Sequence, residues 1–199
     1  MVKKLDKIIS QSQNIVFFGG AGVSTESGIP DFRSPDGLYA QKYPHPPEQM
    51  ISRSFFDAHP AEFFAFYSDR MLALDAQPNR AHRKLAELEQ AGTLSAVVTQ
   101  NIDGLHQKAG SERVLELHGS VLRNFCMDCG AAYPVDELLR LRDEAADGVP
   151  RCPACGGIVK PDVVLYEEAL DEHTLQASVD AIARADLLVV AGTSLAVYP

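Results

Sequence analysis

Close to its beginning the sequence reads Asn14-Ile15-Val16-Phe17-Phe18-Gly19-Gly20-Ala21-Gly22-Val23-Ser24, and this stretch decides the fold. An apolar run that leads directly into glycines is typical of a buried strand followed by a tight turn. Similar apolar runs occur at 94–99, 114–117, 163–166 and 187–191. Segments with helical spacing of apolar residues occur at 3–12, 79–90 and 171–185. Strands that alternate with helices predict an α/β fold with a mostly parallel sheet covered on both faces.

Composition and charge exclude several classes of protein. The chain has 199 residues, of which 46% are hydrophobic and 23% charged, and its formal net charge is −9. This acidic balance argues against a protein that binds the phosphate backbone of nucleic acids, and leaves room for a cationic partner such as a lysine-rich protein. The sequence has no apolar run of the roughly 20 residues that span a bilayer and no signal peptide, so we expect a cytoplasmic protein with no membrane partner.

The segment from 36 to 75 differs from its surroundings. Several prolines and two tyrosines follow Ser34, which predicts an ordered loop. Phenylalanines at helical spacing then predict a helix over 54–74. At the other end, the chain stops at Pro199 soon after a strand. Because doubly wound sheets usually continue with another helix and strand, we expect the C-terminal end of the domain to be missing.

The four cysteines form two C-x2-C pairs, Cys126 with Cys129 and Cys152 with Cys155. Each pair is followed by a glycine, which lets the backbone turn tightly. Four thiolates at this spacing fit one tetrahedral Zn²⁺ with no open coordination position, so the metal is expected to be structural. Two disulfides are the alternative, which a reducing compartment disfavours, and a redox pair would not need the second C-x2-C.

The glycine turn at 20–24 lies between a strand and an expected helix. Backbone N–H groups in such a turn can face a phosphate at the N-terminus of the helix. The spacing is not G-x-G-x-x-G, and no acidic residue follows a second strand where a ribose would need one. The pattern alone therefore leaves two possibilities, a nucleotide site and an ordinary strand-to-helix turn.

Polar residues gather where the expected strands end. Gln100, Asn101 and Asp103 follow one strand, His118 ends another, and Thr193 follows a third. Ligands bind at this edge of doubly wound sheets, although such residues often only cap helices and turn loops. His118 is the best candidate for a catalytic base because of its position and because a histidine pKa near about 6.5 suits proton transfer.

Several long motifs together resemble the sirtuin family of NAD-dependent protein-lysine deacylases, in its compact bacterial form. The matching segments, in the order of the family, are Gly20-Ala21-Gly22-Val23-Ser24, Ser27-Gly28-Ile29-Pro30-Asp31-Phe32-Arg33, Thr99-Gln100-Asn101-Ile102-Asp103-Gly104-Leu105-His106, Leu117-His118-Gly119, the C-x2-C pairs, Lys160-Pro161-Asp162-Val163-Val164 and Gly192-Thr193-Ser194-Leu195. The likeness covers essentially the whole chain.

The resemblance implies a fold and a division into parts. A discontinuous Rossmann-like NAD-binding domain would comprise 1–35, 76–118 and 158–199. A cofactor loop with a helical insertion would occupy 36–75, and a small zinc-binding module 119–157. NAD would lie in the cleft between them.

The resemblance also implies roles for individual residues. Gly20, Ala21, Gly22 and Ser24 would face the cofactor phosphates, while Asp31, Phe32 and Arg33 would belong to the loop that closes over NAD. Gln100, Asn101, Ile102 and Asp103 would line the nicotinamide pocket, with Asp103 accepting from the carboxamide. Gly192, Thr193 and Ser194 would contact the adenosine half.

In the family, the acyl oxygen attacks the ribose carbon as nicotinamide leaves. A base, here His118, then deprotonates a ribose hydroxyl so that the acyl group migrates, which gives free lysine, nicotinamide and O-acyl-ADP-ribose. His118 and Asn101 are thus the expected catalytic residues. Val163 and its neighbours would pair with the backbone of an acylated-lysine protein or peptide as an added strand.

Two features concern the substrate. Many sirtuins continue the Val-Val segment with aromatic residues, a Gly and a Glu, whereas this chain has Leu165-Tyr166-Glu167-Glu168. Tyr67 and Arg70 are three residues apart on an expected helix and hence on one face. Sirtuins that remove succinyl or malonyl groups carry a similar Tyr-x-x-Arg pair, and a guanidinium with a phenol suits a terminal carboxylate. Deacetylation is the default expectation, and a packed Tyr67 with a solvated Arg70 is the alternative interpretation.

Two other functions would use the same motifs. Mono-ADP-ribosyl transfer would need the same NAD site with a different acceptor, and a non-enzymatic NAD-sensing module would need no catalytic base. The intact His118 and Asn101-Ile102-Asp103 favour catalysis. The sequence leaves the oligomeric state open.

Overall fold

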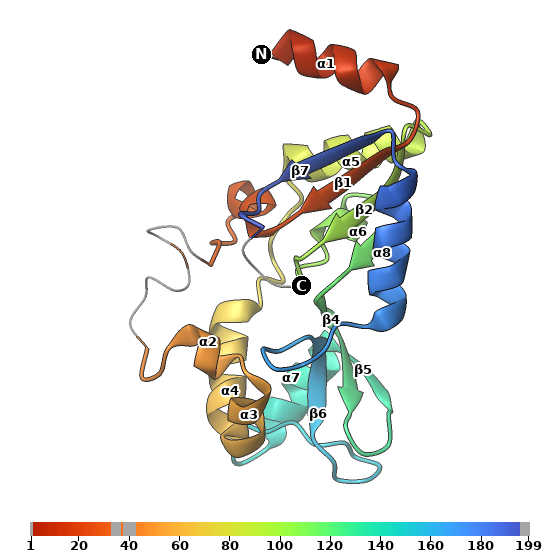
Figure 1. The fold of residues 1–199 in the computed structure, drawn as a ribbon. Helices are drawn as coiled ribbons and strands as arrows, with labels where there is room; N and C mark the ends of the chain where they lie inside the picture. Colours follow the sequence, from red (N-terminus) through yellow and green to blue (C-terminus); the bar gives the residue numbers. More distant parts are fainter. Residues whose placement is uncertain (1, 33–36, 38–42, 196–199) are drawn as a thin grey trace.

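A parallel sheet of four strands, together with the helices around it, forms the larger part of the molecule (Figure 1). The computed structural model describes residues 2–32, 37 and 43–195. The strands lie in the order β3-β2-β1-β7, and each neighbouring pair is parallel. Their bounds are β1 Ile15–Gly19, β2 Leu94–Thr99, β3 Val114–Glu116 and β7 Leu187–Ala191. The predicted α/β class is confirmed.

Helices cover both faces of this sheet (Figure 1). Side chains alternate along β1, so Ile15 and Phe17 pack with Leu85 of one helix, whereas Val16 packs with Ala181 of another. These helices are α5 (Arg80–Gln90) and α8 (Glu172–Arg184). The remaining helices of this part are α1 (Val2–Gln11) and the short α6 (Leu105–Lys108). Burial on both faces explains why the strands read as continuous apolar runs.

The helical insertion differs from the single helix expected over 54–74. It consists of α2 (Pro47–Met50), α3 (Arg53–Ala58), α4 (Pro60–Phe66) and the π-helical turn η4 (Tyr67–Met71). The chain breaks at His59, whose φ of −134° is not helical, because Pro60 cannot continue a helix across its own missing N–H. The phenylalanines form the core of the insertion, where Phe56, Phe63 and Phe64 are each 1% exposed.

A smaller antiparallel sheet, in the order β5-β4-β6, carries the cysteine module. Its elements are β4 Gly119–Cys126, β5 Ala132–Pro134, α7 Val135–Glu144 and β6 Val159–Val163. The strand expected over 163–166 thus lies earlier, and it pairs with β4 instead of joining the parallel sheet. Pro161 lies within β6, which is an edge strand, where proline is tolerated.

Arg123 of β4 links the two sheets. Its guanidinium donates to Glu116 of β3 at 2.7 Å and to Asp162 of β6 at 2.9 Å. In the described ranges, no helix is both long enough and apolar enough to cross a membrane.

Candidate functional site

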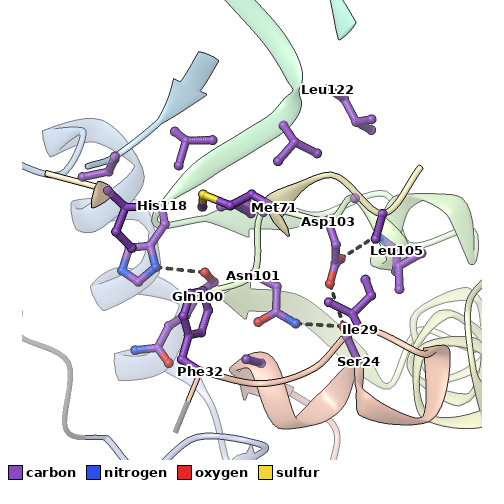
Figure 2. A pocket seen from close by; sticks show the side chains of 18 of the residues that line it. Ser24, Ile29, Phe32, Met71, Gln100, Asn101, Asp103, Leu105, His118 and Leu122 are labelled. Carbon is purple, nitrogen blue, oxygen red and sulfur yellow. Dashed lines mark hydrogen bonds between the residues drawn. The ribbon is translucent and has the colours of Figure 1, made fainter. Parts of the chain in front are cut away.

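A cavity of about 500 Å³ lies at the carboxyl ends of the parallel strands (Figure 2). The turn after β1, the segment after β2 and His118 after β3 form one side of it. Part of the helical insertion and residues 163–168, which continue from β6, form the other side. The sheet edge that the sequence predicted as the ligand site therefore carries a cavity.

The glycine turn packs tightly against the end of β7. A Cβ on Gly22 would lie 2.9 Å from the Cα of Gly192, and a Cβ on Gly20 would lie 2.8 Å from the Oε1 of Gln100. Gly22 also donates its N–H to the carbonyl of Gly192 at 2.9 Å. These glycines are needed for a close approach of backbone segments, while Ala21 between them lines the cavity.

The helix expected after this turn is absent. Two short 3₁₀ turns, Ala21–Val23 and Thr25–Ser27, follow in its place. They end at Gly28, whose φ of 85° is left-handed, and the stretch Thr25-Glu26-Ser27 offers no apolar face for a longer helix to bury. A phosphate here would meet individual N–H groups of a turn and not the end of a long helix.

A hydrogen-bonded group of Ser24, Asn101 and Asp103 lies at the cavity wall (Figure 2). The Oγ of Ser24 donates to Oδ2 of Asp103 at 2.6 Å and accepts from Nδ2 of Asn101 at 3.0 Å. The other carboxylate oxygen of Asp103 accepts from the N–H of Leu105 at 2.9 Å. Two distant segments of the sequence, Ser24 and the pair Asn101 and Asp103, are thereby held in one fixed arrangement.

His118 lies on the cavity wall with one ring nitrogen fixed (Figure 2). Its Nδ1 is 2.9 Å from the carbonyl oxygen of Gln100. Burial lowers the pKa of His118 below its ordinary value, and the bond to the carbonyl opposes this shift. The side chain is therefore a neutral imidazole at neutral pH, which is the state that a general base requires.

His82 and His106 pack against each other, and His82 also caps a helix. The rings pack edge to face at 4.7 Å, and His82 completes the capping box of α5 with Asn79. The Nε2 of His82 also lies 3.5 Å from the Oγ of Ser24. Nothing in the spacing of the sequence signalled this contact, because it joins α5 to the turn after β1.

The expected cofactor residues divide into two groups. Those that line the cavity are Ala21, Ser24, Phe32, Gln100, Asn101, Ile102 and Asp103. Among the described residues, Gly20, Gly22, Asp31, Gly192, Thr193 and Ser194 lie outside its lining. Arg33 falls outside the described residues.

Thr193 does not line the cavity, but it holds the side chain of Gln100, which does. Its Oγ1 donates to the Oε1 of Gln100 at 2.9 Å and accepts from the N–H of Leu195 at 3.1 Å. Gly192 has a φ of 66°, and a Cβ there would lie 2.4 Å from the N atom of Val23. The loop after β7 thus packs against the glycine turn after β1 and holds the Gln100 side chain.

Of the pair Tyr67 and Arg70, only Arg70 lines the cavity, so the alternative of a packed Tyr67 agrees with the structure. Tyr67 is 0% exposed and stacks on Phe63 at 5.7 Å, whereas Arg70 lines the cavity. Because they lie on a π-helical turn, which holds more residues per turn than an α-helix, residues three apart do not share a face. Arg70 pairs with Asp69 at 2.6 Å, and its guanidinium lies 5.7 Å from the centre of the Tyr43 ring.

The four cysteines converge as predicted. Their Sγ atoms all lie within 4.8 Å of one another, and the closest pairs are Cys126 with Cys155 at 3.4 Å and Cys129 with Cys152 at 3.7 Å. Four sulfurs at about 2.3 Å from a tetrahedral Zn²⁺ would be separated by about 3.8 Å. The cluster therefore fits one zinc ion, with every coordination position taken by a thiolate.

Local contacts lower the pKa of Cys126 and Cys152 and raise the pKa of Cys129 and Cys155. The hydroxyl of Tyr133 lies 3.0 Å from the Sγ of Cys152, and this hydrogen bond lowers the pKa of Cys152 to about 6. Gly130 and Gly156 follow the two pairs with φ values of 71° and 82°, so the backbone turns as the sequence indicated. A closed shell of this kind stabilises a fold and leaves no position for a metal-bound water.

Comparison with known proteins gives the family. The model of the Sir2 family matches residues 20–199. The chain belongs to the Sir2 family. An NAD-dependent protein deacetylase of Clostridium perfringens is 58% identical to this Sir2 chain over 200 residues, with 100% of the chain and 80% of the relative covered. A relative of the same name from Sulfolobus acidocaldarius is 46% identical over 198 residues, which cover 99% of the chain and 75% of the relative.

Solved structures agree with this assignment. A Sir2 structure with a p53 peptide and NAD⁺ superimposes with a TM-score of 0.88 at 39% identity, covering 100% of this chain and 78% of that one. A Sir2 protein bound to a propionylated peptide gives a TM-score of 0.88 at 37% identity, with 100% and 78% covered. The Sir2 chain described here accordingly uses NAD and has the cysteine cluster for one zinc ion.

Proposed function

We propose that this Sir2 chain is an NAD-dependent protein-lysine deacylase whose default substrate is acetyl-lysine, and that it forms nicotinamide and O-acyl-ADP-ribose. The observation that carries the proposal is the convergence of His118, Asn101 and Asp103 on one cavity, although they come from two different strand ends. The relatives named as NAD-dependent protein deacetylases support the acetyl default.

The hydrogen-bonded group of Ser24, Asn101 and Asp103, called the Ser24 group below, is proposed to bind the nicotinamide. Because Asn101 donates to the Ser24 hydroxyl and a carboxylate can only accept, Ser24 directs its proton to Asp103. Asp103 also accepts from the N–H of Leu105, and its remaining lone pairs would accept from a carboxamide. Ala21 and Gln100 would lie on the phosphate and ribose sides of the same cavity. The backbone turn at 20–24 suits a phosphate because no side chain projects from its glycines.

NAD, when bound, supplies a ribose carbon that accepts the acyl oxygen as nicotinamide leaves. His118 provides the base for the step that follows. A carbonyl oxygen can only accept, so Nδ1 of His118 carries the proton that bonds to Gln100, and Nε2 carries the lone pair. Nε2 would take the proton of a ribose hydroxyl, and the apolar surroundings of the ring would keep water from competing.

The protein substrate is proposed to bind along β6. This strand lies at the edge of the small sheet, so its outer side can accept a further strand. Val163 at its end lines the cavity, and the N–H of Val164 bonds to the carbonyl of His118 at 3.0 Å. A peptide paired here would therefore place its lysine side chain next to the catalytic base.

Selectivity for an acidic acyl group rests on Arg70 alone. Its guanidinium lines the cavity and could bind a terminal carboxylate, but its position beside Asp69 and Tyr43 means that it already has partners. The hydroxyl of Tyr67 is buried and has no hydrogen-bond partner among the described residues. We therefore propose acetyl as the preferred group and succinyl or malonyl as a secondary activity.

The test is a mass-spectrometric assay of the chain with NAD and matched acetyl-, succinyl- and unmodified-lysine peptides. The proposal predicts loss of the acyl group only when NAD is present, with acetyl removed fastest. Mono-ADP-ribosyl transfer would instead leave ADP-ribose attached to protein. Binding of NAD without release of nicotinamide would show a sensing module and would refute the proposal.

A further inference from the structure

The segment Leu165–Glu168 forms the rim of the cavity on the side proposed for the peptide, and it is tied to the start of α3. The N–H of Arg53 donates to the carbonyl of Tyr166 at 2.9 Å, and the N–H of Tyr166 donates to the carbonyl of Ile51 at 3.0 Å. These bonds form a parallel β-bridge between Ser52 and Tyr166. The rim is thus joined to the helical insertion as well as to β6.

Glu167, the next residue, has a strained backbone. Its φ is 76°, in the left-handed region that glycine adopts freely and other residues adopt at a cost. The only other non-glycine residue with positive φ in the described part of the chain is Leu195. A strained residue in a cavity wall persists only when neighbouring contacts hold it in place.

The carboxylate of Glu167 supplies such contacts. Its Oε2 accepts from the N–H of Ser54 at 2.9 Å, and its Oε1 accepts from the Ser54 hydroxyl at 3.0 Å. Ser54 lies in the first turn of α3, whose N-terminal N–H groups lack partners within the helix. An acidic group at this position is also favoured by the helix dipole. The left-handed backbone of Glu167 is what turns its side chain toward α3.

Glu168 holds the other end of the same turn. Its carboxylate accepts from Nζ of Lys160 at 3.1 Å, from the N–H of Leu165 at 2.8 Å and from Arg53 at 3.1 Å. This ion pair lies in the wall, with side-chain exposures of 14% for Lys160 and 18% for Glu168. Glu168 therefore anchors the rim both to Lys160 of β6 and to Arg53 of α3, whereas Glu167 anchors it to Ser54 of α3.

We propose that Glu167 is a positioning residue that fixes the peptide-binding rim by clamping it to Ser54 of α3, and that it thereby sets the affinity for the acylated peptide. This inference rests on the proposed function for the identity of the ligand. The two hydrogen bonds of the clamp join Glu167 to Ser54 and include neither His118 nor any residue of the Ser24 group, so its loss is expected to affect binding of the peptide and to leave binding of NAD unchanged.

Steady-state kinetics of four variants separates the clamp from a direct effect of charge. Glu167→Ala loses the clamp and keeps the strain, so the peptide KM is expected to rise about tenfold. Glu167→Gly loses the clamp but relieves the strain, and a rise of about threefold is expected. Ser54→Ala retains the Glu167 side chain and its bond to the N–H of residue 54, and removes only the bond from the Ser54 hydroxyl, so about a twofold rise is expected. Exposed Glu172→Ala on α8 is the matched control and should match the wild type.

The NAD KM should stay unchanged in all four variants. Equal effects of Glu167→Ala and Glu167→Gly, with none from Ser54→Ala, would show that the charge alone matters and would overturn the clamp. A parallel change in the NAD KM would overturn it as well, because it would indicate general damage to the fold.

Hydrogen exchange of the amides supplies a readout that does not depend on activity. In Glu167→Ala, exchange at 163–170 and 51–58 should accelerate, while exchange in α8 should match the wild type. Unchanged exchange at both segments would contradict the clamp even if the chain is an active deacylase. Faster exchange in a chain without deacylase activity would support the clamp and refute only the proposed function.

Discussion

The Nδ1 atom of His118 lies 2.9 Å from the backbone carbonyl oxygen of Gln100. Gln100 itself is held by its N–H bond to the carbonyl of Gly19 at 2.9 Å and by its side-chain bond to Thr193. The catalytic candidate is therefore oriented by backbone atoms of the sheet edge, which no substitution at Gln100 removes. This arrangement fixes both the tautomer and the direction of the ring.

Substitution of His118 tests its role as base. His118→Tyr is expected to lower kcat for deacetylation by a factor of about 10²–10⁴, because no other group replaces the Nε2 lone pair. Binding of NAD, measured by calorimetry, should persist. Substantial turnover by the variant would show that another residue takes the proton.

The pH dependence of kcat/KM follows from the lowered pKa of His118. Burial favours the neutral ring, so the base stays competent at pH values below the ordinary histidine pKa of about 6.5 and loses its function only at lower pH. An acidic limb above this value would contradict the assignment. The profile should be recorded with a substrate peptide that lacks other ionisable groups.

Ser24→Ala tests the nicotinamide side of the site. Loss of the hydroxyl leaves Nδ2 of Asn101 without its acceptor and removes one bond to Asp103, so a cost of about 1–3 kcal/mol is expected. The NAD KM should rise by at least tenfold, with little change in the peptide KM. Thr25→Ala, which removes an exposed hydroxyl bonded to the carbonyl of Gly22, is the control. Equal effects of the two substitutions would contradict a specific role for Ser24.

Zinc removal tests the cysteine cluster. Metal analysis of protein purified without chelator should find one zinc per chain, and Cys126→Ser or prolonged chelation should lower the melting temperature strongly, because metal binding contributes directly to folding. The melting temperature should recover when zinc is restored to the chelated protein. A chain with well under one zinc and unchanged stability would contradict a structural site.

Arg70→Met tests acyl selectivity. If the guanidinium binds a terminal carboxylate, kcat/KM for succinyl-lysine peptides should fall about tenfold, with kcat/KM for acetyl-lysine peptides nearly unchanged. Exposed Arg80→Met at the start of α5 serves as the charge-matched control. An equal loss on both peptides would show that Arg70 only packs against Tyr43.

His106 makes the stability of the fold sensitive to acid. It is 1% exposed, and burial together with the neighbouring His82 lowers its pKa from 6.5 to about 4. The unfolded chain then binds a proton that the folded chain does not, so stability is lost as the pH falls from about 6.5 towards 4. The free energy of unfolding should fall by roughly 2 kcal/mol between about pH 7 and about pH 5 from this residue.

His106→Leu should remove much of this acid sensitivity. Neither ring nitrogen of His106 has a hydrogen-bond partner among the described residues, so an apolar side chain of similar size should be tolerated at neutral pH. Urea unfolding of both proteins at the two pH values measures the difference. Identical pH dependence of the two proteins would contradict the assignment.

Sequence patterns correctly predicted the strands and helices that have a clear apolar period or a capping residue in their own sequence. The run Leu94–Thr99 is buried on both faces, and α5 begins beside the capping residue Asn79. The convergence of four thiolates also followed from spacing, because two tight turns place each pair. Periodicity and capping are local properties, so they can be recognised without the tertiary structure.

The features that the sequence did not predict depend on contacts between distant segments. The helical insertion breaks at Pro60, and the π-helical turn separates Tyr67 from Arg70. Two short 3₁₀ turns, packed against Gly192, occupy the place of the helix expected after β1. The contact of His82 with Ser24 arises because α5 packs against β2, with no signal in its own spacing. The types of residue at the strand ends were enough to identify the candidate site. Which of these residues line the cavity depends on tertiary packing.

The most direct test of the central claim follows the acyl group itself. A peptide carrying an isotope-labelled acetyl-lysine is incubated with the chain and NAD, and the products are analysed by mass spectrometry. The label should appear on ADP-ribose, in amounts equal to the nicotinamide released. Labelled free acetate formed without consumption of NAD would contradict the account.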